Sequence, residues 1–154
     1  MKSDNWSWPV LFVILTLAAV GCSPSERTRM QAYELKELHC LKQYRTGDIQ
    51  AAKQALLDYL RLVEAEQASG LPFTKTAYTK ALIAARLSLI CRKLGDARLA
   101  DQYLHEAVVY ARQDAQEERN KAWLEKTDEE IGTLMLHLVT KLDETNTHPK
   151  WRME

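Results

Sequence analysis

The chain of 154 residues is 46% apolar and 27% charged, a composition that suits one small globular domain. Its 21 basic residues balance its 21 acidic residues, which argues against a nucleic-acid partner and against electrostatic binding to an anionic membrane. Only five Gly and four Pro are present, and most of them separate periodic segments, so we expect long helices with short connections.

The first 21 residues differ from the rest of the chain. Val10 to Val20 is an uninterrupted run of 11 residues in which Thr16 is the only polar member. Such a run is too short to span the roughly 30 Å hydrocarbon core of a bilayer, and it fits the apolar region of a signal peptide. The run ends in Ala19-Val20-Gly21-Cys22. This ending resembles the lipobox of bacterial lipoproteins, in which small residues precede a cysteine that is lipidated.

The resemblance implies that residues 1–21 are removed, that Cys22 carries the lipid and that residues 22–28 tether the domain. Ser23 follows the cysteine, and in proteobacterial lipoproteins a residue other than Asp there directs the protein to the outer membrane. We therefore expect a domain in the periplasm of a bacterial cell envelope, anchored by lipid to the outer rather than the inner membrane. The alternative is an ordinary secretory leader or a short anchor in which Cys22 has no special role.

Five helical segments are expected after the leader. Apolar residues at helical spacing predict helices over residues 27–46, 49–68, 76–94, 97–118 and 126–142. Gly95 suits the position after a helix where the backbone needs positive φ, and Asp96 is placed to cap the next helix. Thr127 and Glu130 have the spacing of a capping box. Residues 145–154 are polar and contain a proline, so we expect a flexible, frayed tail.

Two of these helices begin after the same turn sequence. Gly47-Asp48 and Gly95-Asp96 lie 48 residues apart. When the two turns are aligned, eight following positions are apolar or aromatic in both copies, and Ala52 aligns with Ala100. The sequence therefore contains a repeated helix-turn-helix unit.

The repeated unit resembles the tetratricopeptide repeat family. In that family a Gly at the turn is followed by small, large and small residues at fixed spacing in the second helix. Those positions hold Gly95, Ala100, Leu104 and Ala107 in the second unit and Gly47, Ala52, Leu56 and Tyr59 in the first. The chain departs from the family at Lys36 and Ala84, where the usual residue is Trp, and its period is 48 residues against about 34. The resemblance implies an all-α fold of stacked antiparallel hairpins, two hairpins plus a C-terminal capping helix, over residues 29–144.

Two cysteines remain when Cys22 is lipidated. Cys40 and Cys91 form an even pair in a domain expected to be exported, where disulfides form. The alternatives are a disulfide between them and two buried free thiols that pack as small apolar residues. No His or Cys residues have the spacing of metal ligands, and no nucleophile elbow or phosphate-binding loop is present. We therefore expect no metal, no cofactor and no catalysis.

Tyr44 and Tyr78 lie on the first helices of their hairpins, the helices that line the concave surface of tetratricopeptide arrays. The resemblance implies a surface at which these residues act with Lys36, Lys80 and Arg86 to bind an acidic or C-terminal peptide of an unidentified protein. We predict a non-enzymatic adaptor with a role such as cell-envelope or secretion-apparatus assembly. Two other classes stay open: a structural lipoprotein that forms a homodimer, and a small-ligand binder or hydrolase.

Overall fold

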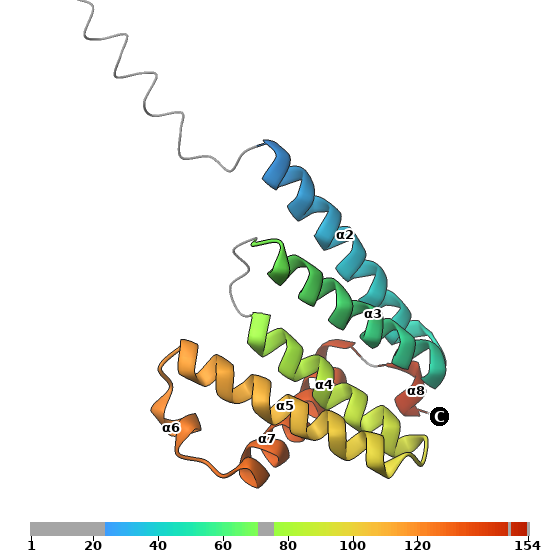
Figure 1. The fold of residues 1–154 in the computed structure, drawn as a ribbon. Helices are drawn as coiled ribbons and strands as arrows, with labels where there is room; N and C mark the ends of the chain where they lie inside the picture. Colours follow the sequence, from blue (N-terminus) through green and yellow to red (C-terminus); the bar gives the residue numbers. More distant parts are fainter. Residues whose placement is uncertain (1–23, 71–75, 148, 154) are drawn as a thin grey trace, which may run out of the picture. The chain divides into compact units, whose positions relative to one another are not determined.

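The computed structural model describes residues 24–70, 76–147 and 149–153, and over these residues the chain is all-α. Seven α-helices and one π-helix follow one another in this described part: α2 (Pro24–Thr46), α3 (Ile49–Ala68), α4 (Thr76–Lys93), α5 (Ala97–Glu117), α6 (Lys121–Leu124), α7 (Asp128–Leu142), η1 (Asp143–Thr147) and α8 (Lys150–Met153). Figure 1 labels the α-helices. The predicted lipidation site at Cys22 lies outside the described residues. No helix in the described part is both long enough and apolar enough to span a membrane.

The chain divides into two compact units, Met1–Ala32 and Tyr33–Glu154. In the first unit, the described residues form the N-terminal part of α2, and their side chains from Glu26 to Ala32 are exposed. The second unit holds the rest of α2 and all the other helices. It extends beyond the predicted limit at residue 144 because residues near the C-terminus, Pro149 and Trp151, are buried within it.

Local signals account for most helix ends. Gly95 has a φ of +81°, and the side chain of Asp96 accepts a hydrogen bond from the backbone N–H of Leu99, so both predictions for this turn are confirmed. The capping box of Thr127 and Glu130 is also present at the start of α7. The Asp96 cap and the capping box each provide hydrogen-bond acceptors for backbone N–H groups that the start of a helix leaves without partners. The predicted bounds of α3 agree with the structure, and those of the other four predicted helices differ from it by one to three residues at an end.

The C-terminal residues differ from the expectation of a frayed tail over residues 145–154. Within the described residues of this segment, η1 ends at Thr147 and α8 follows at Lys150–Met153. Trp151 is only 3% exposed, and its ring meets the Tyr44 ring edge-on with 6.0 Å between the centroids. Burying a large aromatic side chain contributes roughly 1.5–3 kcal/mol, which offsets the entropy lost when a short segment is ordered. Burial of Trp151, together with Pro149, therefore holds in place a segment whose composition is mostly polar.

Two clusters of buried side chains form the core of the second unit. The first joins α2, α3, α4 and α8 through large residues: Tyr33, Cys40, Tyr44, Ala52, Ala55, Leu56, Tyr59, Val63, Ile83, Leu87, Ile90 and Trp151. The second joins α4, α5 and α7 through smaller ones: Ala81, Ala84, Ala85, Ala107, Val108, Ala111, Ile131, Met135 and Val139. We call its five alanines the alanine seam, along which α4 and α5 lie side by side (Figure 1). Because α4 contributes to both clusters, it is the central helix of the unit.

Candidate functional site

The five residues predicted to form one partner-binding surface do not share a surface. Tyr44 and Arg86 belong to a buried polar cluster. Tyr78 lines a pocket formed by α4, α5, α6 and α7, whereas Lys36 lines a separate groove between α2 and α3. Lys80 donates a hydrogen bond to another side chain at the end of α3. The five residues therefore lie at several separate places in the structure.

The buried polar cluster is centred on Asp143, whose side chain is fully buried. The Tyr44 hydroxyl donates to Oδ2 at 2.7 Å, and the Arg86 Nε–H donates to Oδ1 at 2.9 Å. Arg152 completes the cluster as an ion pair, with its Nε atom 3.4 Å from Oδ2. A carboxylate removed from water is tolerated only with partners of this kind. The cluster therefore ties α2, α4 and the C-terminal segment to one another.

These contacts correct the prediction that Tyr44 and Arg86 face a partner. Tyr44 is fully buried, and the Arg86 guanidinium packs over its ring at 5.5 Å from the centroid. Burial first, and then the negative charge of Asp143, raise the pKa of Tyr44 far above the ordinary value of a tyrosine. The hydroxyl is therefore protonated at every physiological pH and serves as a permanent hydrogen-bond donor to Asp143.

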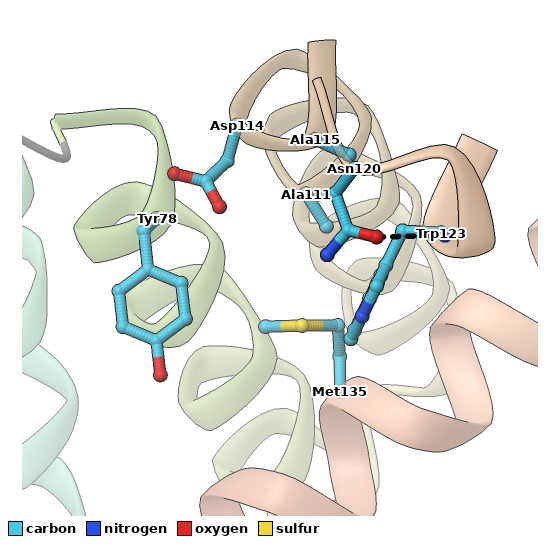
Figure 2. Close-up of a pocket in the computed structure, with 7 residues that line it drawn as sticks. All are labelled: Tyr78, Ala111, Asp114, Ala115, Asn120, Trp123 and Met135. Atoms are coloured by element: carbon cyan, nitrogen blue, oxygen red, sulfur yellow. Dashed lines mark hydrogen bonds between the residues drawn. The ribbon is translucent and has the colours of Figure 1, made fainter. Parts of the chain in front are cut away.

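The pocket that contains Tyr78 is the candidate binding site and is shown in Figure 2. Its volume is about 190 Å³, and α4, α5, α6 and α7 contribute the residues around it: Tyr78, Ala111, Asp114, Ala115, Asn120, Trp123 and Met135. Figure 2 shows the Tyr78 ring on one side and the Trp123 indole on the other, with the Met135 thioether extending between them. The carboxylate of Asp114 and the amide of Asn120 lie above this apolar floor in the same view.

The connection between α5 and α6 places Asn120 and Trp123 at the pocket. Arg119 adopts a positive φ of 54°, which reverses the chain after α5. Asn120 then caps α6, because its side-chain oxygen accepts from the backbone N–H of Trp123 at 3.4 Å. The short helix α6 thus turns Trp123 toward α7, where it packs against the second cluster.

The lining of this pocket suits an apolar group with polar neighbours. Aromatic rings, alanine methyls and a flexible thioether supply apolar contact surface, while a carboxylate and an amide provide hydrogen-bonding groups beside it. Pockets that hold a drug-sized ligand are usually about 300–1,000 Å³. The volume of about 190 Å³ fits a single large side chain from a partner better than it fits a free metabolite.

The groove between α2 and α3 is larger, with a volume of about 580 Å³, and it is more open to solvent. It is lined by Leu35, Lys36, His39, Cys40, Gln43, Asp58, Arg61 and Leu62. Arg61 and Asp58 pair with each other at 3.0 Å on the exposed surface of α3. The groove is therefore apolar along part of its length and bordered by charged side chains.

Cys40 and Cys91 are both free and buried, as in the packing alternative. Burial is the largest cause that raises the pKa of each thiol, so both are protonated at neutral pH. Lys80 has a packing role as well: it donates to Gln67 at 2.6 Å and lies 5.3 Å from the ring centroid of Tyr110. Within the described residues, no three His, Cys, Asp or Glu side chains gather as metal ligands.

Comparisons of the chain with protein families, curated proteins and solved structures find no match.

Proposed function

We propose that the protein is a lipid-anchored adaptor of the bacterial cell envelope, whose helical domain binds a protein partner in the periplasm without catalysing a reaction. The pocket of Figure 2 carries this proposal, because its two aromatic rings and Met135 offer a preformed recess for one apolar side chain. The partner is expected to present a leucine, methionine or phenylalanine, with polar neighbours that meet Asp114 and Asn120.

The lipid anchor is supported by the leader sequence, which ends in small residues followed by Cys22. In this proposal residues 1–21 are removed and acyl chains on Cys22 hold the domain at the outer membrane. Each buried methylene contributes about 0.8 kcal/mol, so several acyl chains together bind the protein firmly.

The proposed scaffold is a short stack of two tetratricopeptide-like hairpins capped by α7. The small residues that match the family pattern, Ala52 in the first repeat and Ala100 and Ala107 in the second, are fully buried. Small side chains at those positions allow helices to pack closely. A rigid helical scaffold suits an adaptor, because the pocket then loses little conformational entropy when a partner binds.

Site-specific crosslinking in bacteria tests the pocket and the anchor together. A photoreactive amino acid replaces Tyr78 in the full-length chain, and the matched control replaces Val109, which is 49% exposed on α5 and outside the pocket lining. We expect a discrete adduct from position 78, in the membrane fraction, and none from position 109. The Trp123→Ala change should reduce that adduct about tenfold or more, because truncating an aromatic anchor commonly costs over 1.4 kcal/mol of binding.

Cys22→Ser in the same cells should move the protein and its adduct to the soluble fraction. Equal adducts from positions 78 and 109, or an adduct unaffected by Trp123→Ala, would contradict the pocket. Retention of the Cys22→Ser protein in the membrane would contradict the lipid anchor.

A further inference from the structure

One side of α2 exposes large apolar residues to solvent. Leu35 and Leu38 are 69% and 62% exposed, whereas Cys40 and Tyr44 on the same helix are buried in the first cluster. At 3.6 residues per turn, the two leucines lie on nearly the opposite side of the helix from those two core residues. Apolar side chains therefore occupy both sides of α2, and the core accounts for only one of them.

The two leucines form a continuous apolar face rather than isolated exposed residues. They are one turn apart on the helix, and Leu35 also lines the groove that continues across to Leu62 on α3. Scattered exposed leucines need no explanation, but adjoining ones that run into a groove indicate an interaction surface. We call Leu35 and Leu38, with their charged neighbours Glu34 and Lys42, the α2 face.

The charges of the α2 face indicate which partner covers it. Glu34 lies on the N-terminal side of the leucines and Lys42 on the C-terminal side, and both side chains are exposed. Neither forms an ion pair within the described part of the chain. The nearby Glu37 is already engaged, because its carboxylate accepts from the Tyr59 hydroxyl. Glu34 and Lys42 are thus left to meet charges from outside the protomer.

A second copy of the same helix supplies matching charges in one orientation only. When two α2 helices cross antiparallel at Leu38, Glu34 of each copy lies beside Lys42 of the other, and the two Leu38 side chains meet with Leu35 of each copy next to them. A parallel crossing instead places Glu34 beside Glu34 and Lys42 beside Lys42, which is unfavourable. The face is therefore complementary to itself with two-fold symmetry.

We propose that the α2 face is a homodimer interface, in which α2 of a second copy packs antiparallel with four leucines at the centre and two Glu34–Lys42 ion pairs at the sides. The interface uses different residues from the pocket of Figure 2, so one dimer presents two such pockets. Two crossing helices bury less than the roughly 1,200 Å² of a stable interface, so the dimer is weak in solution. Confinement to a membrane raises the effective concentration and favours it; this last point rests on the proposed lipid anchor.

Disulfide trapping in membranes of cells that express the full-length chain tests the interface. Leu38→Cys is oxidised with copper phenanthroline, and Val109→Cys, at an exposed position on α5, is the matched control. We expect Leu38→Cys to give a band of twice the monomer mass at least fivefold stronger than that from the control. The native thiols of Cys40 and Cys91 are buried and should give no band in the unmodified chain.

Charge reversal then separates a second copy from any other partner. Glu34→Lys in the Leu38→Cys background should reduce the band severalfold, and Lys42→Glu should do the same. The double reversal should restore the band, because it recreates the two ion pairs with opposite polarity. A different partner protein or a lipid surface has no reason to respond in this way.

The proposal is overturned if Leu38→Cys and Val109→Cys give equal bands, if the crosslinked product contains another protein, or if the double reversal fails to restore the band. Circular dichroism of each purified variant checks that these exposed changes leave the fold intact. Blotting the soluble and membrane fractions of the same cells shows separately whether the anchor fails, so failure of the interface is distinguishable from failure of the proposed anchor.

Discussion

The α2–α3 and α4–α5 regions share the Gly-Asp turn sequence, yet different side chains hold their helices together. Along the alanine seam, α4 and α5 meet through methyl groups. The core between α2 and α3 contains the aromatic rings of Tyr33, Tyr44 and Tyr59. Small residues let helices approach closely, whereas tyrosines fill a wider space and bring hydroxyl groups that need partners when buried.

The tyrosine hydroxyls make the α2–α3 region dependent on polar contacts. Tyr59 donates to Glu37 within the region, but Tyr44 donates to Asp143, which lies 99 residues away in sequence. Trp151 adds an apolar contact from the same C-terminal segment. One period of apolar residues is therefore compatible with two kinds of packing, and only the tyrosine-rich kind depends on distant charged residues.

Removing the carboxylate of Asp143 should have the largest effect. Asp143→Ala leaves Arg86 and Tyr44 without their shared acceptor, and breaking a buried ion pair in this way costs about 3–5 kcal/mol of the free energy of unfolding. Urea denaturation followed by circular dichroism measures it. The control is Glu144→Ala, an exposed neighbour expected to change stability by about 0.5 kcal/mol or less. If Asp143→Ala lowered the free energy of unfolding by less than about 1 kcal/mol, the buried polar cluster would not hold α2, α4 and the C-terminal segment together.

Replacing an alanine of the alanine seam with a larger residue should have an intermediate effect on the free energy of unfolding. Ala107 is fully buried where α5 faces α4, so Ala107→Leu forces the two helices apart and should cost about 1–3 kcal/mol. Val109→Leu on the exposed side of α5 is the matched control and should be nearly neutral. The same denaturation experiment applies. If Ala107→Leu proved as stable as the control, the close packing assigned to this region would be wrong.

Substitution of the two turn glycines should have the smallest and most selective effect. Gly95 has a positive φ, and a side chain added there would meet no neighbouring atom within 4 Å. Because Asn tolerates a positive φ, Gly95→Asn should lower the free energy of unfolding by less than about 1 kcal/mol. At Gly47 a Cβ would lie 2.7 Å from the Ala51 Cβ and 2.8 Å from the Gln43 carbonyl oxygen. Gly47→Asn should therefore cost about 1–3 kcal/mol through steric strain.

Thermal unfolding of the two glycine variants ranks them directly. A Gly47→Asn protein that melts at or above the temperature of Gly95→Asn would contradict the distinction between the two turns. That distinction is invisible in the sequence, because both turns read Gly-Asp and both aspartates cap the helix that follows.

Much of the candidate site could not be predicted from the sequence. The sequence predicts Tyr78 as a candidate binding residue but gives no sign of Trp123 and Met135, which line the same pocket, because a pocket formed by four helices depends on how those helices pack. The Asn120 cap of α6 was a usable local signal: an Asn three residues before a lone Trp in a polar segment. For Tyr44 and Arg86 the sequence predicts a partner-facing surface, whereas both contact buried Asp143, because helical spacing does not show which side of a helix a distant segment covers.

The sequence is sufficient to predict the all-α class, five helices and their turns, because those features depend on residues within a few positions of each other. Gly95 needs only its own backbone conformation, and the Thr127–Glu130 capping box closes within one helical turn. Tertiary structure decided that the C-terminal segment is ordered, that Asp143 is buried and that Leu35 and Leu38 are exposed. These outcomes depend on contacts between residues far apart in the chain, where burial of Trp151 and pairing of Asp143 outweigh the local preference of a polar segment to fray.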